Sequence, residues 1–391
     1  MMLRKKLLSL LAVLVFVGNA WAGNLKIKVY NPGAKAIFPI TSTLVYGDKD
    51  AILIDAQFQK QYAEELVKEI KATGKNLKTV FISHSDPDFY FGLDVIKKAF
   101  PNVRIISTAQ TAYLISASKD DKLAVWNPQL KADAPSEVYV PQAVDSIPDL
   151  EGNKIEIRQN PDDPAHSFLW IPSLKTIVGG ISVSVDSHIW MADTQNNEAI
   201  DKWIAQIDAM KALQPQQVVP SHFAQLNLSP QSLDFVKKYL ENYKKAVHEN
   251  KSSDAIVKYM VSQYPDLPGK EELEMGVKVF LGEMNWDLRT PYPAIGRKVE
   301  VDFGKGKFVL DYKDNKTMSF SGTEAFKGIS DTVEYTATEI AKNIFMVYWH
   351  EPKTGENVTH IQDYNKNIIY TNIAGKDGSF DHFKVPFKIL K

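Results

Sequence analysis

Residues 78–92 read KTVFISHSDPDFYFG, and this stretch predicts a strand followed directly by a polar loop. Residues 79–82 are β-branched or aromatic, a composition that predicts a buried strand. His84, Asp86 and Asp88 then occupy every second position. Because α/β sheets usually place their sites just beyond the carboxyl ends of strands, we expect these three side chains to converge on one point.

A plainer interpretation of the same loop is open at this stage. Asp and Ser often stand between a strand and a helix simply as turn and cap residues. Pro87 predicts that the loop continues as neither strand nor helix, and a helical pattern then covers residues 91–100. Whether the loop carries chemistry therefore depends on the rest of the chain.

The first 22 residues differ from the rest of the 391-residue chain, whose length allows two domains. They combine basic residues at positions 4–6, an apolar run at 7–17 and Ala-Trp-Ala at 20–22. This pattern predicts a secretory signal peptide, cleaved after Ala22. The apolar run is shorter than the roughly 20 residues that span a membrane. We therefore expect a periplasmic or secreted protein with no integral membrane segment after cleavage.

Charge and cysteine content narrow the function classes. Loss of the leader lowers Lys plus Arg from 46 to 43 against 47 Asp plus Glu, so the net charge moves from −1 to −4. Such a chain is not suited to nucleic acid or to an anionic membrane. The absence of Cys excludes a thiolate metal site and a cysteine nucleophile. The expected partner is a small-molecule substrate, and the oligomeric state stays open.

The first half of the chain reads as strands alternating with helices. Strands are predicted at 25–30, 43–46, 51–54, 79–82, 103–106, 137–140, 154–158, 167–170, 176–178 and 217–220, and helices at 59–73, 108–126 and 199–213. Pro128 is expected to end the second helix. This order predicts an α+β domain in which two mixed sheets pack face to face with helices outside. Residues 235–284 are helical, with breaks at Pro265 and Pro268.

The pattern changes at Asn285. From Pro293 onward, short alternating segments are separated by turn signals at intervals of about ten residues, as in small all-β domains. Strands are predicted at 298–303, 307–312, 317–320, 332–340, 344–349, 357–364 and 368–373. The sequence therefore predicts a domain at residues 23–284 and an antiparallel barrel or sandwich at 285–391.

Three of the eight histidines stand at predicted strand ends of the first domain. These are His84, His166 and His222, and Asp86 and Asp88 lie beside the first of them. A lone His in a loop is usually structural or solvated, but three strand-end histidines with two acids are better explained by a shared metal. Imidazole and carboxylate are good ligands for zinc and also accept manganese or iron.

The same landmarks resemble the metallo-β-lactamase superfamily over roughly residues 23–222. Leu53-Ile54-Asp55 resembles its early strand ending in Asp, and residues 84–89 stand where its His-x-His-x-Asp-His motif belongs. His166 matches the third metal-binding histidine, and residues 219–222 resemble the late Pro-Gly-His. The resemblance implies an αββα sandwich and hydrolytic activity.

Three departures from the family pattern alter the implied metal site. Asp86 replaces the second histidine of the motif, Phe89 replaces the final one, and Ile181 aligns with the acid that bridges two metals. The resemblance then implies a first site of His84, Asp86 and His166, while the second keeps only Asp88 and His222. We therefore expect one tightly bound divalent metal, most simply zinc, and a doubtful second.

The second half resembles the MoaF-like, lipocalin-like barrels from Pro293 to the end of the chain. The resemblance rests on residues 333–340, 345–349 and 358–364. Such barrels often enclose a small apolar ligand. The alternative is that aromatic side chains such as Trp349 simply fill the interior. His350 and His360 are expected on a surface or strand face rather than as ligands.

Two functions follow from these patterns. The first is an exported metal-dependent hydrolase in which a metal-activated water attacks an ester, lactone or amide, with Asp88 orienting the water or moving its proton. Tyr90, His188 and Trp190 would line the substrate pocket. The alternative is a non-catalytic small-molecule-binding protein on a degenerate fold. Metal content separates the two.

Overall fold

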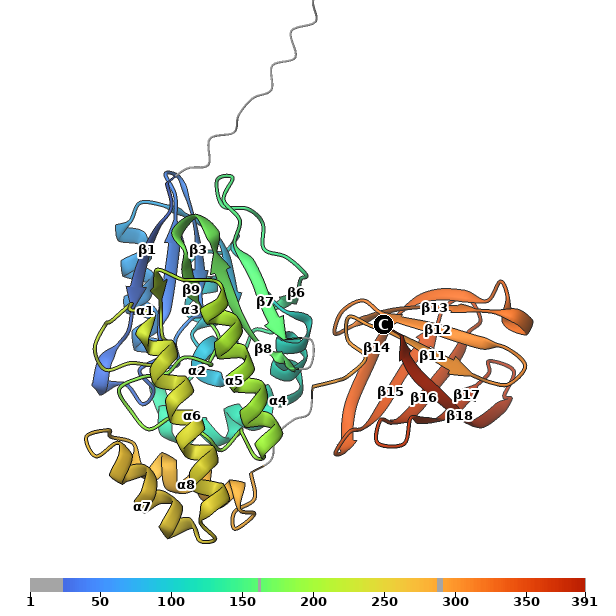
Figure 1. Ribbon diagram of the computed structural model, residues 1–391. Helices are drawn as coiled ribbons and strands as arrows, with labels where there is room; N and C mark the ends of the chain where they lie inside the picture. Colours follow the sequence, from blue (N-terminus) through green and yellow to red (C-terminus); the bar gives the residue numbers. More distant parts are fainter. Residues whose placement is uncertain (1–23, 161–162, 287–290, 391) are drawn as a thin grey trace, which may run out of the picture.

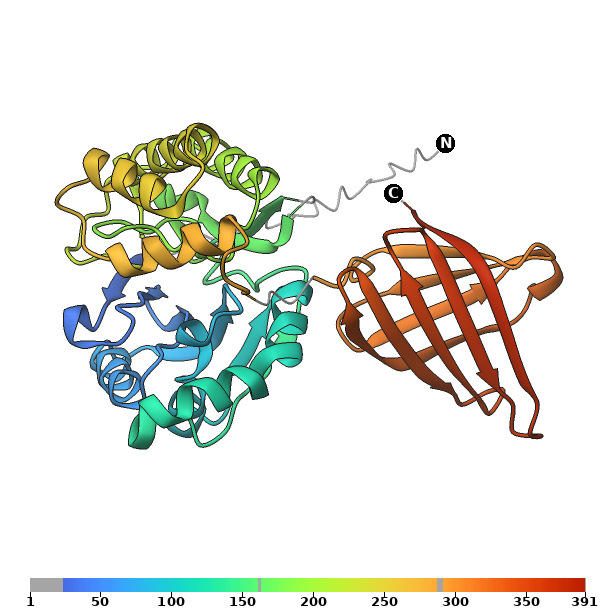
Figure 2. The same cartoon turned by 90° about the horizontal axis from the view of Figure 1, so that it is seen from below.

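A computed structural model describes residues 24–160, 163–286 and 291–390, and the predicted signal peptide lies outside these ranges. The first part of the chain holds two sheets packed face to face, with helices outside (Figures 1 and 2). One sheet has the order β1-β2-β3-β4-β5-β6 and the other β10-β9-β8-β7. The strands are β1 (Lys26–Tyr30), β2 (Ser42–Tyr46), β3 (Asp50–Ile54), β4 (Asn76–Ile82), β5 (Arg104–Ser107), β6 (Gln142–Ala143), β7 (Glu156–Asn160), β8 (Asp163–Ile171), β9 (Thr176–Val178) and β10 (Gln217–Val218).

Three layers of apolar side chains hold this sandwich together. Val45, Ile54, Phe81, Leu169 and Val178 belong to a buried cluster that joins the two sheets. A second cluster packs the first sheet against helices α1 to α4, and a third packs the second sheet against α5 to α8. The predicted αββα arrangement is therefore confirmed, because each sheet buries one face on its partner and the other on helices.

Eight helices are present in the described ranges. They are α1 (Lys60–Ala72), α2 (Pro87–Tyr90), α3 (Leu93–Ala99), α4 (Ala109–Leu130), α5 (Asn197–Ala212), α6 (Gln231–Glu249), α7 (Ser253–Gln263) and α8 (Lys270–Phe280). Two expectations about proline were wrong. Pro87 is the first residue of α2, where its missing N–H costs nothing, and Pro128 lies inside α4 rather than beyond its end.

The predicted strand at residues 137–140 is also absent from the structure, which describes that segment as irregular. The edge strand of the first sheet is instead β6, a two-residue strand parallel to β5. Alternating apolar residues there pack against the core of the first sheet without joining a ladder, since Val138 and Val140 are partly buried in that cluster.

The C-terminal part is a closed antiparallel barrel, so the barrel was the correct one of the two predicted alternatives. Its strands are β11 (Lys298–Asp302), β12 (Lys307–Tyr312), β13 (Thr317–Gly322), β14 (Ser330–Ala341), β15 (Ile344–Glu351), β16 (Glu356–Asp363), β17 (Ile368–Ala374) and β18 (Phe380–Leu390). Closure depends on β18, which sequence reasoning missed and which pairs with β11 from Leu390–Lys298 to Phe387–Val301.

Aromatic side chains fill much of the barrel interior. Tyr292 is fully buried there and donates its hydroxyl hydrogen to Gln362 Oε1 at 2.8 Å. Trp349 is also buried, and its ring meets that of His360 edge-on at 4.7 Å. His360 thus faces the interior, whereas His350 is exposed, and burial lowers the pKa of His360 to about 3. These contacts favour a barrel interior filled by aromatic side chains over one that encloses a small apolar ligand.

Tyr292 also links the barrel to the first domain. Gln110 of α4 donates to the carbonyl oxygen of Tyr292 at 2.7 Å, and the rings of Tyr113 and Tyr292 lie 6.0 Å apart. Leu114 and Ala165 join the same buried cluster as the barrel residues. The α4 helix that flanks the first sheet therefore also provides the surface on which the barrel packs.

The domain boundary stays a prediction, and limited proteolysis tests it. Trp286 is bonded to Asp193 in the first domain, whereas Tyr292 is buried in the barrel. We therefore expect trypsin to cut first at Arg289, between these anchors, and to release two folded fragments that mass spectrometry and circular dichroism identify. Arg289→Gln should remove this first cut. A stable fragment that crosses residues 285–292 would place the boundary elsewhere.

Candidate functional site

The loop after β4 is fixed by a buried carboxylate. Asp55, at the end of β3, accepts hydrogen bonds from Ser83 N at 2.8 Å and from Ser83 Oγ at 2.7 Å. The amide of Gly180, just beyond β9, donates to Ser83 Oγ at 2.7 Å. Burial raises the pKa of Asp55 to about 8, and the charge of Asp88 adds to this effect. The ends of β3, β4 and β9 are thus joined through one acid and one hydroxyl.

Two glycines allow the backbone segments around the site to approach closely. A Cβ at Gly92 would collide with the carbonyl oxygen of Ala56, and Gly92 N donates to Gln57 O at 2.8 Å. A Cβ at Gly180 would collide with Ser167 O, and its φ of +77° is itself unfavourable for other residues. Gly92 thus lets the start of α3 lie against the segment after β3, and Gly180 lets the segment after β9 lie against the middle of β8.

Two of the three strand-end histidines lie together. The imidazole rings of His84 and His166 are stacked, with centroids 5.5 Å apart and an interplanar angle of 19°. Asp163 contacts Nδ1 of His166 with both oxygens at 2.8 Å, which directs Nε2 away from that acid. Burial acts to lower the pKa of His166, but Asp163 outweighs it and raises the pKa overall. A carboxylate behind a histidine is the usual support of a metal ligand.

Asp86 lies next to this histidine pair, and both of its oxygens are engaged. Asp86 Oδ2 is 3.4 Å from His84 Nε2, and Oδ1 is 3.1 Å from the Nζ of Lys122. The same ammonium donates to Ser85 O at 2.7 Å. Burial acts to raise the pKa of Asp86, yet Lys122 and His84 hold it well below its usual range. Asp86 is therefore ionised and already paired with a cation.

Asp88 and His222 form a separate pair. His222 Nε2 lies 2.9 Å from Asp88 Oδ2, and its Nδ1 lies 3.1 Å from Ser221 Oγ. Asp88 is buried and His222 is half-buried. Isolated bridges to Ile40 and Ser184 hold the backbone of His222 between the two sheets. The two residues that sequence analysis assigned to a second metal thus bond to each other.

Phe89 stands between these two groups. Its ring is fully buried, 5.2 Å from the ring of His84 and 6.0 Å from the ring of His222, and it meets both near edge-on. Ile181, aligned with the bridging acid, packs against the core of the first sheet. Both family departures therefore replace ligands by apolar packing, which separates a His84, Asp86 and His166 group from the Asp88 and His222 pair.

Sequence reasoning missed two acids at the site, Asp163 behind His166 and Asp193. Asp193 accepts an indole N–H from Trp190 and another from Trp286, each at 2.7 Å and each on its own oxygen. Burial raises the pKa of Asp193, and the nearby charge of Asp86 adds to it while His84 opposes it. Trp190 and Trp286 meet near edge-on at 5.5 Å. The three-residue spacing of Trp190 and Asp193 could have indicated their contact. The contact with Trp286 could not be found in this way, because Trp286 lies 93 residues beyond Asp193.

The predicted pocket residues have different surroundings. Trp190 is partly exposed beside Asp193. Tyr90 is fully buried in the core around β4, and within the described part of the chain its hydroxyl has no hydrogen-bond partner. His188 is buried with its Nδ1 3.0 Å from Tyr239 OH, and burial lowers its pKa. Trp190 thus has the exposure expected of a pocket residue, whereas Tyr90 and His188 are packed inside the protein.

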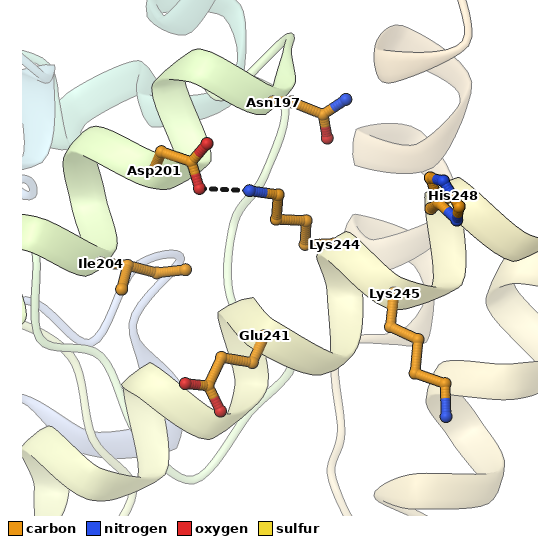
Figure 3. Close-up of a pocket in the computed structure, with 7 residues that line it drawn as sticks. All are labelled: Asn197, Asp201, Ile204, Glu241, Lys244, Lys245 and His248. Carbon is orange, nitrogen blue, oxygen red and sulfur yellow. Dashed lines mark hydrogen bonds and ion pairs between the residues drawn. The ribbon is translucent and has the colours of Figure 1, made fainter.

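A hollow on the surface of α5 and α6 lies apart from these groups (Figure 3). It is lined by Asn197, Asp201, Ile204, Glu241, Lys244, Lys245 and His248. Lys244 and Asp201 are paired across it. None of the predicted site residues lines this hollow, and its charged side chains neutralise one another, so it adds no chemistry to the site.

Two stretches of the chain match known protein families. Residues 37–222 match the family model of the metallo-beta-lactamase superfamily, and residues 295–388 match the MoaF-like family model. A metallo-beta-lactamase from Pontibacter korlensis is 20% identical, with 56% of this chain and 100% of that chain covered and a TM-score of 0.40. A beta-lactamase domain protein from Burkholderia ambifaria is 13% identical, with 67% and 87% covered and a TM-score of 0.47. No curated protein matches the chain.

Both resemblances inferred from the sequence are confirmed by these matches. The protein combines a metallo-β-lactamase-like domain, matched over residues 37–222, with a closed antiparallel barrel that matches the MoaF-like family over residues 295–388. Within the described ranges, no helix is both long and apolar enough to cross a membrane.

A divalent metal, which the superfamily generally binds, fits the site in part. His84 and His166 supply imidazoles and Asp86 supplies a carboxylate, and the Nδ1 of His84 is buried without a partner among the described residues. This donor set suits one cation. As the side chains stand, however, residues 24–160, 163–286 and 291–390 contain no group of three or more His, Asp or Glu arranged to hold a metal. The Lys122 ammonium on Asp86 is the feature that a cation would have to displace.

Asp55 should make stability depend on pH. Because the pKa of folded Asp55 is raised to about 8, its contribution to stability is complete below the unfolded pKa near 4 and is lost as the pH rises toward 8. We expect the wild type to lose roughly 2–4 kcal/mol more than Asp55→Asn between pH 4 and pH 8. Urea unfolding in chelator-treated buffer measures this, with Asp149→Asn as an exposed control. Equal pH dependence in the wild type and Asp55→Asn would show that Asp55 is ionised when folded.

Proposed function

We propose that this protein is an exported hydrolase that works with one divalent metal, most simply zinc, with manganese or iron as alternatives. The observation that carries the proposal is the stacked pair of His84 and His166 with Asp86 beside it, at the strand-end loop. Superfamily membership of residues 37–222 supports the reaction class. The apolar contacts of Phe89 and the packing of Ile181 favour one metal over two.

The metal would be held by His84, Asp86 and His166, and when bound it would supply a water acidified toward a pKa of about 7. Asp163 keeps the His166 ring oriented through Nδ1, so Nε2 is the nitrogen available to a ligand. Such a carboxylate behind the ring also raises the basicity of the imidazole.

Asp88 and His222 would handle protons. Asp88 Oδ2 and His222 Nε2 lie 2.9 Å apart, so one proton can be shared between them. Asp88 belongs to the same loop as Asp86, and its burial keeps water from competing for this proton. The pair can therefore accept a proton from the attacking water and pass it to the leaving group, the role of a general acid–base residue. Ser221 Oγ contacts the other ring nitrogen of His222 and orients it.

The substrate class would be a small ester, lactone or amide. Trp190 and Trp286 are fixed by the shared carboxylate of Asp193, whose pKa responds to both Asp86 and His84. This aromatic pair is partly exposed, so it offers an apolar wall next to the acidic site. A flat or apolar portion of the substrate would contact these indoles.

A second candidate is a small-molecule-binding protein without turnover. It is favoured by the Lys122 ammonium on Asp86 and by the lack of a ready three-ligand group among the described side chains. In such a protein the paired charges would be structural, and a ligand would bind against them without metal. Elemental analysis and assays distinguish this candidate from the hydrolase.

Metal content is expected to be one equivalent per chain. Inductively coupled plasma mass spectrometry after extensive dialysis should give about one for the wild type and none for His84→Ala or His166→Ala, since each removes a ligand. His350→Ala, which removes an exposed barrel histidine, should keep one equivalent. Two equivalents would show that Asp86 or Asp88 bridges two metals, and Asp88→Ala should then lose one of them. A metal-free wild type would favour the binding protein.

Hydrolysis should depend on Asp88. On a panel of esters and lactones, Asp88→Asn is expected to lower kcat by about 10²–10⁴-fold while metal content stays at one equivalent, because the amide cannot move a proton. Removal of the metal from the wild type with a chelator should abolish activity, and returning the metal should restore it. Full activity of Asp88→Asn, or activity that survives chelation, would contradict this mechanism.

A further inference from the structure

Lys122 reaches the candidate metal site from the outer helix α4. Its side chain is half-buried, and its Nζ contacts two acceptors of the loop, Asp86 Oδ1 at 3.1 Å and Ser85 O at 2.7 Å. These contacts cross 36 and 37 residues of chain, so they arise from the packing of α4 on the first sheet. The amine is therefore held at the loop by the fold rather than by local sequence.

The ammonium uses the carboxylate that a metal would need. One oxygen of Asp86 faces Lys122 and the other faces His84 Nε2, so a cation at Asp86 must replace one of these contacts. Replacing the contact to His84 is easy, because that imidazole is itself a ligand. A metal that replaced only the His84 contact would lie within a few ångströms of Lys122. Like charges at that separation repel strongly where water is partly excluded, so the ammonium must leave Asp86 as the metal binds.

The charges at the site are consistent with Lys122 and a metal using the same carboxylate. Asp86 stands where the superfamily motif has a neutral histidine, and Lys122 supplies a positive charge opposite that acid. A neutral histidine would leave a neighbouring ammonium unpaired, whereas Asp86 pairs with it. The carboxylate and the ammonium therefore behave as one unit, in which the lysine occupies the place of a cation when no metal is bound.

We propose that Lys122 is a tethered cation that competes with the divalent metal for Asp86 and thereby sets the metal affinity of this site. The inference rests on the proposed single-metal site of His84, Asp86 and His166. Metal binding would expel the ammonium from Asp86 toward solvent, so the site exchanges one cation for another. Removal of the ammonium leaves Asp86 with its His84 contact and without a competing cation, so metal affinity rises.

The test is isothermal titration of the chelator-treated full chain with zinc and, separately, with manganese. Lys122→Met should bind metal about tenfold tighter or more, because the competing charge is gone. Lys122→Gln serves the same purpose if the methionine variant is unstable by thermal unfolding. Lys122→Arg keeps the charge and should stay near the wild-type Kd. Lys119→Met removes a similarly exposed lysine of the same helix, paired with Asp120, and should also leave Kd unchanged.

A second readout follows the amine itself. Amine-directed acetylation with peptide mass spectrometry should label Lys122 faster in the metal-loaded protein than in the metal-free protein, and Lys119 equally in both. Unchanged labelling of Lys122 on metal binding would contradict the exchange of cations.

The titration separates this inference from the proposed function. If the wild type binds metal and Lys122→Met binds it no tighter, the competition is wrong and the single-metal site stands. If only the lysine variants bind metal, the competition is right and the wild type is not the proposed metal hydrolase. If neither binds metal, both proposals fail.

Discussion

The two hydrogen bonds from Ser83 to buried Asp55 are the interaction on which the site depends. They bind the end of β4 to the end of β3, and the bond from Gly180 to Ser83 adds the end of β9 in the opposite sheet. His84, Asp86 and Asp88 follow Ser83 within five residues, on the same loop. Because the junction is buried and bonded from both sheets, the loop that carries His84 has a fixed path.

Around this junction, an apolar ring takes the place of a metal ligand, and each remaining acid is paired with a basic side chain. Phe89 fills the space between the rings of His84 and His222, which leaves each imidazole with its own acid. Asp86 then keeps its charge because Lys122 faces it, and Asp88 is paired with His222. A two-metal site would place two cations among shared acids. Here each acid has its own partner instead, Lys122 for Asp86 and His222 for Asp88. The ring of Phe89 thus separates the two groups of side chains.

The barrel is connected to this frame through α4. The same helix donates from Gln110 to Tyr292 at the barrel and reaches Asp86 with Lys122 about three turns later. Tyr292 in turn joins a buried network with Gln362 and Tyr312, so the linker end is bonded into the barrel interior. One helix therefore contacts both the candidate metal site and the second domain.

The sequence alone determined the two-domain α+β and barrel architecture, the strand before His84, and the positions of Phe89 and Ile181, because periodicity and motif order are properties of neighbouring residues. It failed at Pro128, which helix α4 accommodates in its last turn, and at β18, where Pro386 disguised a strand that the barrel needs for closure. Only the tertiary structure brought Lys122 to Asp86 and Trp286 to Asp193, contacts that span 36 and 93 residues. Local sequence carries no information on which distant side chain meets a charge, since that depends on how helices and sheets pack.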